Sequence, residues 1–221
     1  METLKGFLNR IAHASVGRAS PPCLIAVSKF QPVEQMLELY RQGQRDFGEN
    51  YVQELISKAH ELQDRGAHGV RFHFIGKLQS NKVKQLLPFV SIIHSVDSLK
   101  LLREIDKQAR AMGMVIPVFF QVNIDREPTK GGFDPADLSA IPPALSQCTG
   151  VIPRGLMAIP NPELDPESAF RRMQELSQQH SATLGAELSM GMSADFESAI
   201  RFGATHVRIG TALFGARKPI S

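Results

Sequence analysis

Short apolar runs alternate with segments of helical periodicity along most of the chain. The first run ends in Lys29, and prolines flank the expected strand, residues 24–29, on both sides. An apolar run this short, bounded by prolines, indicates a buried strand and not a core helix. Because alternate side chains of a strand face opposite ways, Ile25, Val27 and Lys29 share one face. A lysine at a strand end is most often a solvated cap, so the rest of the chain has to decide where Lys29 points.

The alternation continues through eight strand candidates, each followed by a helical pattern. Strands are expected at 24–29, 46–50, 72–75, 91–95, 117–123, 155–159, 187–190 and 205–209. Helices are expected at 4–11, 33–43, 51–65, 83–87, 99–109, 134–147, 165–184, 193–203 and after 210. This order predicts an α/β protein, and eight units fit a closed (β/α)8 barrel of the TIM type. An open doubly wound sheet is the alternative. A barrel of this length is commonly one domain, so residues 1–221 are expected to form a single domain.

In such barrels the functional groups gather at the carboxyl ends of the strands, where Lys29 lies. Arg208 lies in the last strand candidate and faces the opposite way to its apolar neighbours. An inward arginine keeps its charge and therefore needs an acceptor or an anion beside it. Glu49, Glu187 or a ligand could provide that partner.

Two further segments follow the last two strand candidates. One contains Gly191 and Ser193, and the other is Gly210-Thr211. The first is not a nucleophile elbow, because Asp195 stands where that motif requires glycine. Each segment alone is most often an ordinary helix cap. Together they occupy the loops that frequently bind phosphate in barrels, so they predict a phosphate site at the starts of two helices.

Composition narrows the function classes only slightly. The net charge of +3 comes from scattered residues and does not argue for nucleic-acid binding. The two cysteines, Cys23 and Cys148, form no CxxC pair, which fits a reducing compartment and a cytoplasmic location. No apolar run reaches membrane-spanning length. The N-terminal pattern indicates an amphipathic helix, although Lys5 and Arg10 leave a transit peptide open.

The seven histidines predict no metal site, because they include no HxxxH or HExxH pair. His73, near a strand end, fits a core position and a functional position equally well. A lysine, an inward arginine and a phosphate cradle at one end of a barrel suggest a phosphorylated aldehyde held as a Schiff base. Pyridoxal 5′-phosphate (PLP) has the aldehyde, the phosphate and a ring nitrogen that needs a protein partner.

Seven motifs then occur in order along nearly the whole chain. They are Ala26–Lys29, Phe47–Glu54, His73–Lys82, His94–Ser98, Gly155–Met157, Leu188–Ser193 and Val207–Gly210. With these motifs the chain resembles the YggS/PROSC family, the pyridoxal phosphate homeostasis proteins. That family is similar in fold to the N-terminal barrel domain of alanine racemase, the PLP fold type III.

The resemblance implies a cofactor-binding role for eight residues. Lys29 would carry PLP as a Schiff base and Arg208 would face the pyridine nitrogen. The phosphate would be held by Ser193 and the backbone of Gly210-Thr211. Asn50, His73 and Met157 would lie around the ring.

Two lysine positions of the family are less clear. Gln31 stands where many relatives carry a second lysine, which puts in doubt any role of that position in passing the cofactor on. Lys130 matches another family lysine, and the sequence around Lys130 suggests no role for it.

The sequence favours a carrier over an enzyme. An arginine beside the ring nitrogen disfavours ring protonation and weakens the ring as an electron sink. Alanine racemases add a tyrosine from another domain, for which 221 residues leave no room, and Tyr51 is the only candidate because Tyr40 lies in a helix. We therefore expect a monomer or weak dimer that buffers PLP or delivers it to apo-enzymes. A racemase- or decarboxylase-like PLP enzyme and a barrel that binds only phosphate are the alternatives.

Overall fold

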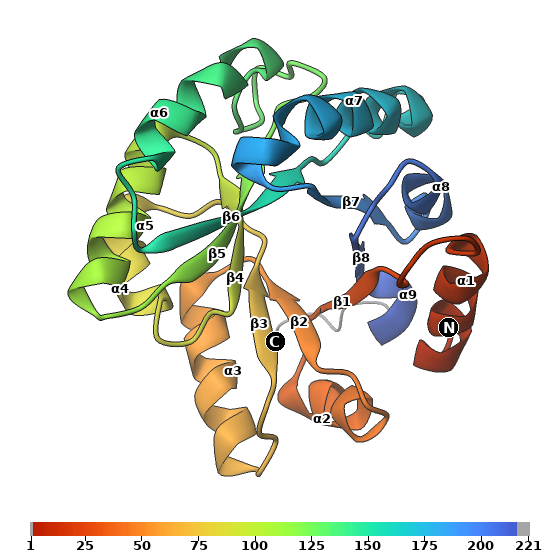
Figure 1. Ribbon diagram of the computed structural model, residues 1–221. Helices are drawn as coiled ribbons and strands as arrows, with labels where there is room; N and C mark the ends of the chain where they lie inside the picture. The colour runs from red at the N-terminus through yellow and green to blue at the C-terminus, as the bar shows by residue number, and fades with distance from the viewer. Residues whose placement is uncertain (1, 216–221) are drawn as a thin grey trace.

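Eight parallel strands form a closed barrel in the computed structural model (Figure 1). The structure describes residues 2–215, so the predicted domain limits at 1 and 221 lie outside the described residues. The strands are β1 Cys23–Val27, β2 Asp46–Glu49, β3 Arg71–Phe74, β4 Ile92–Val96, β5 Ile116–Gln121, β6 Val151–Met157, β7 Glu187–Met192 and β8 His206–Ile209. Each strand pairs with the next, and β8 closes the ring by pairing with β1. The predicted (β/α)8 barrel is confirmed, and the open sheet is excluded.

Helices surround the strands on the outside of the barrel (Figure 1). They are α1 Leu4–Ala14, α2 Val33–Arg41, α3 Val52–Asp64, α4 Val83–Leu86, α5 Leu99–Ala111, α6 Ile141–Leu145, α7 Pro166–Leu184, α8 Phe196–Arg201 and α9 Thr211–Phe214. Two 3-10 turns, η1 Ser80–Lys82 and η2 Pro135–Ala140, precede α4 and α6. Within residues 2–215, none of the helices combines the length and the apolar character that crossing a bilayer would take.

Two predicted helices differ from the structure. The expected helix 134–147 is divided into η2 and α6, because prolines at 142 and 143 lack the N–H that continues a helix. The expected helix 193–203 begins only at Phe196. The residues before it form a turn in which Asp195 Oδ1 accepts the Met192 N–H at 2.6 Å. Ser193 therefore lies in this turn and not directly at a helix start, as the sequence suggested.

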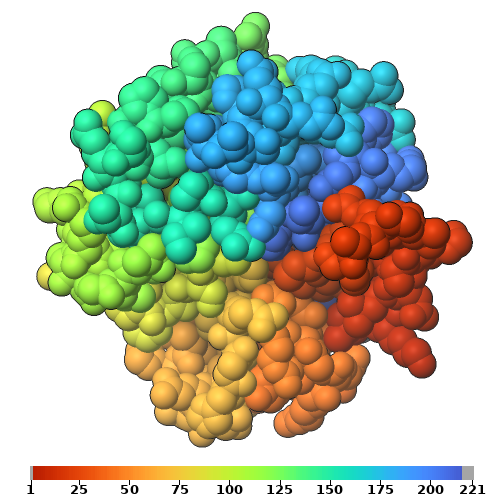
Figure 2. Space-filling model, viewed as in Figure 1, coloured from red at the N-terminus to blue at the C-terminus, as the bar shows by residue number. Residues whose placement is uncertain are grey.

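Strand parity divides the core into two layers. Leu24, Ala26 and Phe120 belong to the apolar layer that packs under the helices. The opposite faces of the same strands fill the barrel interior, where a Cβ at Gly48 would lie 2.9 Å from Ile25 Cγ2. The space-filling view along the same direction shows a closed surface over the barrel centre (Figure 2). The interior is therefore a packed core that positions side chains, and not a pore.

Candidate cofactor-binding site

A cavity of about 230 Å³ lies at the carboxyl end of the barrel. Its lining brings together six of the eight predicted site residues: Lys29, Asn50, Ser193, Arg208, Gly210 and Thr211. The remaining lining residues are Val27, Ile75, Ile159 and Met192, which are all apolar. One amine, one guanidinium, two hydroxyls and one amide thus share a cavity with apolar walls, as small-molecule sites usually do.

Arg208 is a buried cation in the wall of this cavity. Only 4% of its surface is exposed. Its Nη1 donates to Ser189 Oγ at 2.8 Å and its Nη2 to the Ala158 carbonyl at 2.9 Å. Burial lowers the pKa of Arg208 to about 10, so it is still charged at neutral pH. Neither glutamate suggested by the sequence is its partner, because Glu49 pairs with Lys58 and Glu187 with Arg154.

The backbone on both sides of Lys29 is fixed by buried polar contacts. Lys58 Nζ donates to the Ser28 carbonyl at 2.6 Å, and Ser28 Oγ donates to Glu49 Oε1 at 2.7 Å. On the other side, the Phe30 N–H donates to Glu54 Oε1 at 2.6 Å. Phe30 has a φ of 60°, a conformation that a bulky side chain adopts only when its surroundings impose it. This arrangement holds the Lys29 backbone in one place below the cavity.

Lys58 connects these contacts. Its ammonium lies 2.7 Å from both Glu49 Oε1 and Glu54 Oε1, and Glu49 is fully buried. Burial raises the pKa of Glu49, and the neighbouring Lys58 cation acts against that rise. The sequence reasoning missed this group. A signal was present, since Lys58 follows Leu55 by three residues and precedes Leu62 by four on the apolar stripe of α3.

Asn50 offers a direct test of whether the cavity fits the predicted cofactor. Its side-chain Oδ1 is buried and has no hydrogen-bond partner among the described residues. An unpartnered amide of this kind is costly unless a ligand satisfies it. With a buried guanidinium and the hydroxyls of Ser193 and Thr211 in the same lining, the residues present fit a small anionic ring compound such as PLP.

The structure places His73 and Met157 outside this lining. His73 is 1% exposed, and its ring is hydrogen bonded to His94 and to Asp46 in the barrel interior. Met157 is fully buried at the end of β6. A role for either residue at the cofactor ring stays a prediction.

Potential metal ligands gather once within residues 2–215, at the amino end of the barrel. Cys23, Asp46 and His73 have ligand atoms within 4.8 Å of one another. His73 Nε2 and Arg71 already contact the Asp46 carboxylate. Burial, and after it the Asp46 charge, raises the pKa of the Cys23 thiol, which disfavours the thiolate that a metal needs. The group behaves as a hydrogen-bonded cluster.

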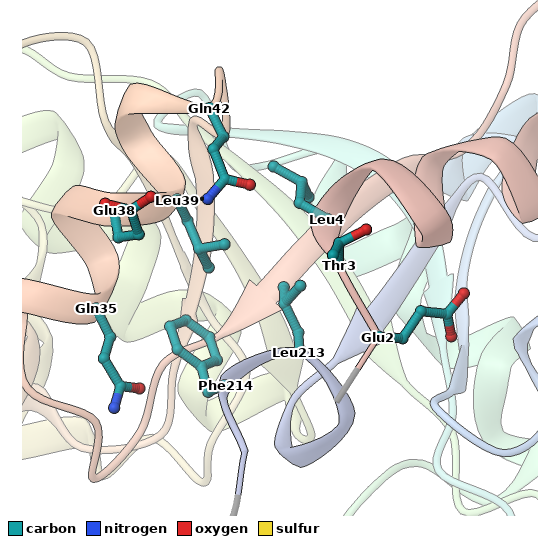
Figure 3. A pocket seen from close by; sticks show the side chains of 9 residues that line it. All are labelled: Glu2, Thr3, Leu4, Gln35, Glu38, Leu39, Gln42, Leu213 and Phe214. Carbon is teal, nitrogen blue, oxygen red and sulfur yellow. Dashed lines mark hydrogen bonds between the residues drawn. The ribbon is translucent and has the colours of Figure 1, made fainter.

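A second cavity, of about 270 Å³, lies between the start of α1, one side of α2 and the end of α9 (Figure 3). The ionisable side chains in its described lining are Glu2 and Glu38, and no lysine or arginine lines it there. Two carboxylates repel a phosphate. The smaller cavity at Lys29 is therefore the better candidate for a phosphorylated ligand.

Comparison with known proteins agrees with this geometry. The family model described as alanine racemase, N-terminal domain, matches residues 10–218. The pyridoxal phosphate homeostasis protein of Pseudomonas aeruginosa is 43% identical over 214 residues, which cover 94% of this chain and 91% of the relative. The chain belongs to the pyridoxal phosphate homeostasis protein family.

Solved structures show the same relationship. One is the structure of PipY from Synechococcus elongatus with PLP bound, which has a TM-score of 0.82 and 41% identity to this homeostasis-family protein. The match covers 94% of this chain and 99% of PipY. An alanine racemase of Clostridium difficile has a TM-score of 0.72 at 16% identity and covers 97% of this chain and 59% of the racemase. That second likeness shows a shared fold only.

Three further positions of this homeostasis-family chain were singled out by the sequence. Gln31 is 7% exposed, and its N–H donates to the Ser28 carbonyl at 3.0 Å. Lys130 forms an ion pair with Glu127 and donates to the Pro160 carbonyl at 3.3 Å. Tyr51 is 51% exposed and lies outside the cavity lining, with its ring 5.1 Å from that of Phe30.

Proposed function

We propose that this chain binds PLP as a Schiff base on Lys29 in the cytoplasm, and that it buffers the cofactor or delivers it to apo-enzymes. The observation that supports this most directly is the convergence of Lys29, Arg208 and Ser193 on one cavity. The PLP bound to PipY and the names of the curated relatives point to the same ligand.

Each lining residue has a distinct proposed task. The ε-amino nitrogen of Lys29, in its deprotonated form, would provide the covalent attachment point, and Arg208 would donate a hydrogen bond to the ring nitrogen. Ser193, Gly210 and Thr211 would hold the phosphate, and the Asn50 amide would bind a ring substituent. When bound, PLP supplies an aldehyde and an electron-withdrawing ring. Because Arg208 keeps its proton, it disfavours protonation of the ring nitrogen and so favours storage of the cofactor over carbanion chemistry.

Borohydride reduction tests the attachment point. The wild-type protein is incubated with PLP, reduced, digested and mapped by mass spectrometry. We expect a pyridoxyl adduct on Lys29, and no visible cofactor absorption in Lys29→Ala. The exposed Lys77 gives a matched control, since Lys77→Ala should load like the wild type. Equal loading of Lys29→Ala and wild type would contradict the proposal.

A racemase- or decarboxylase-like activity is the alternative within the same cofactor class. Tyr51 is its candidate acid or base, since it follows Asn50 of the cavity lining. Deuterium exchange at the α-carbon of a panel of amino acids distinguishes the two functions. We expect no sustained exchange. Turnover in the wild type that is lost in Tyr51→Phe would overturn the carrier function.

A further inference from the structure

A continuous chain of side-chain hydrogen bonds crosses the barrel interior from the cavity to the opposite end. Arg208 Nη1 lies 2.8 Å from Ser189 Oγ, which lies 2.8 Å from His94 Nδ1. His94 Nε2 lies 2.9 Å from His73 Nδ1, and His73 Nε2 lies 3.0 Å from Asp46 Oδ1. The five residues come from β8, β7, β4, β3 and β2. Asp46 is the first residue of β2, at the end of the barrel remote from Lys29.

The two ends of this chain fix its direction. A guanidinium can only donate, so Ser189 Oγ accepts from Arg208, and its own hydroxyl proton is then available to donate to His94 Nδ1. Burial is the largest cause that lowers the pKa of His94 well below its ordinary value, so this ring is neutral. Its single N–H is then on Nε2 and donates to His73 Nδ1. His73 Nδ1 is the acceptor in that contact, so the His73 N–H is on Nε2 and donates to the Asp46 carboxylate, which can only accept.

Water cannot replace these contacts. Ser189 and His94 are fully buried and His73 is 1% exposed. The His94 ring also stacks on Phe119, with ring centroids 4.5 Å apart and an interplanar angle of 16°. A buried donor that loses its acceptor here destabilises the protein by its full desolvation penalty. Each hydrogen bond in the chain therefore constrains the donor and acceptor roles in the next one.

We propose that Asp46 is a positioning residue for the cofactor, which holds the guanidinium of Arg208 at the ring nitrogen through His73, His94 and Ser189. This inference rests on the proposed PLP-binding function. Arg208 has a second acceptor in the Ala158 carbonyl, but only the Ser189 contact depends on a proton whose direction Asp46 sets. Without the carboxylate, the histidine tautomers are no longer fixed, and Ser189 need not turn its lone pair toward Arg208.

The tautomers can be measured on the protein without PLP. Long-range ¹H–¹⁵N NMR spectra of the histidine rings, assigned with His73→Gln and His94→Gln, distinguish the two neutral forms. We expect both His73 and His94 to carry the proton on Nε2 in the wild type. A proton on Nδ1 of His94 in the wild type would overturn the proposal.

The effect on PLP binding is measured in a pair of variants that differ only in the acceptor. Arg71→Met removes the arginine partner of Asp46 and leaves the chain intact, so the dissociation constant for PLP should stay within about twofold of wild type. Adding Asp46→Leu removes the acceptor, and we expect the dissociation constant to rise about tenfold, as for one charge-assisted hydrogen bond. The visible absorption band of the bound cofactor should shift as well, which a merely structural change would not cause.

Ser189→Ala cuts the chain next to Arg208 and provides the second test. It should weaken PLP binding as much as the Asp46→Leu/Arg71→Met pair, and the combined triple variant should be no weaker than Ser189→Ala alone. Additive losses, or wild-type affinity in folded Asp46→Leu/Arg71→Met, would refute the role of Asp46. If that pair does not fold, Ser189→Ala and the wild-type tautomers decide the question. If the wild type takes up no PLP, the proposed function fails, while the tautomers still test the chain.

Discussion

At the scale of single residues, the barrel interior determines which polar groups carry charge. Arg208 keeps its proton despite burial, while His94 and His206 are held neutral by the same low-dielectric surroundings. His206 is 8% exposed, and burial lowers its pKa to about 3. Since the Arg208 cation and these two neutral rings share the interior, protonation of either ring acts against folding.

A pH dependence of stability follows from His206. An unfolded histidine has a pKa of about 6.5, so the stability contributed by keeping His206 neutral is fully present above that pH and is lost as pH falls toward about 3. The free energy of unfolding should fall by up to about 1.4 kcal/mol per pH unit below pH 6.5 for each such histidine.

Urea unfolding at several pH values between 7 and 5 measures this slope. His206→Gln should reduce the dependence of the unfolding free energy on pH by the contribution of one histidine. His94 is expected to cause the dependence that remains. His68 is exposed, so His68→Gln should keep the wild-type slope. An unchanged slope in His206→Gln would contradict the assignment.

At the scale of elements, helix α3 connects the end of β1 to the rest of the barrel. Glu54 and Lys58 lie one turn apart on α3, and both reach the backbone beside Lys29. Lys58 also neutralises Glu49 at the end of β2. One helix therefore holds two neighbouring strand ends where the cavity begins.

Lys58→Met should destabilise the protein strongly. It leaves the fully buried Glu49 carboxylate without its cation, and breaking one partner of a buried pair typically costs about 3–5 kcal/mol. Guanidinium unfolding at neutral pH gives this value, and the deficit should shrink at lower pH as Glu49 becomes protonated. Lys84→Met, at an exposed position on α4, should stay within about 0.5 kcal/mol of wild type. A deficit of similar size in both variants would argue against the buried cluster.

The elements also show which parts of the fold and of the site can be predicted from the sequence alone. Alternating patterns predicted the eight strands, and parity predicted the inward direction of Arg208, because both follow from backbone geometry. The strand expected at 24–29 ends at Val27, so Lys29 reaches the cavity from the turn that follows β1 and not through strand parity. The single helix expected at 134–147 is divided into η2 and α6, because the prolines at 142 and 143 lack the N–H groups that would continue one helix. The contacts from Ser189 to Asp46 could not be predicted, since they depend on which inward side chains meet across the barrel. Glu49 was suggested as a partner for Arg208, but it forms an ion pair with Lys58 of α3 instead.

At the scale of the whole molecule, the first helix packs against the last part of the described chain. Helix α1 packs on α8, where the ring centroids of Phe7 and Phe196 are 5.9 Å apart. Arg10 also binds Glu197 through two contacts of 3.0 and 2.8 Å. Since β8 pairs with β1, the beginning and the end of the described chain support one another.

Phe7→Ala should therefore weaken the entire barrel and not only its first helix. Phe7 is 1% exposed, and removing such a ring typically costs about 3–5 kcal/mol. Unfolding followed in parallel by circular dichroism and by amide hydrogen exchange should show one earlier transition. Leu8 is 45% exposed, so Leu8→Ala is the matched control with little expected loss. A separate early loss of α1 alone would show that the stability of the barrel does not depend on this helix.

The closed ring of strands has a consequence for how this protein meets other chains. Each of the eight described strands has a hydrogen-bonded neighbour on both sides. The barrel therefore presents no strand edge along its circumference onto which an extended peptide or an aggregating segment could add. Recognition of another protein through the described region has to use side chains. The exposed rings of Phe30 and Tyr51, which lie beside Lys29 and Asn50 in the chain, are side chains of this kind.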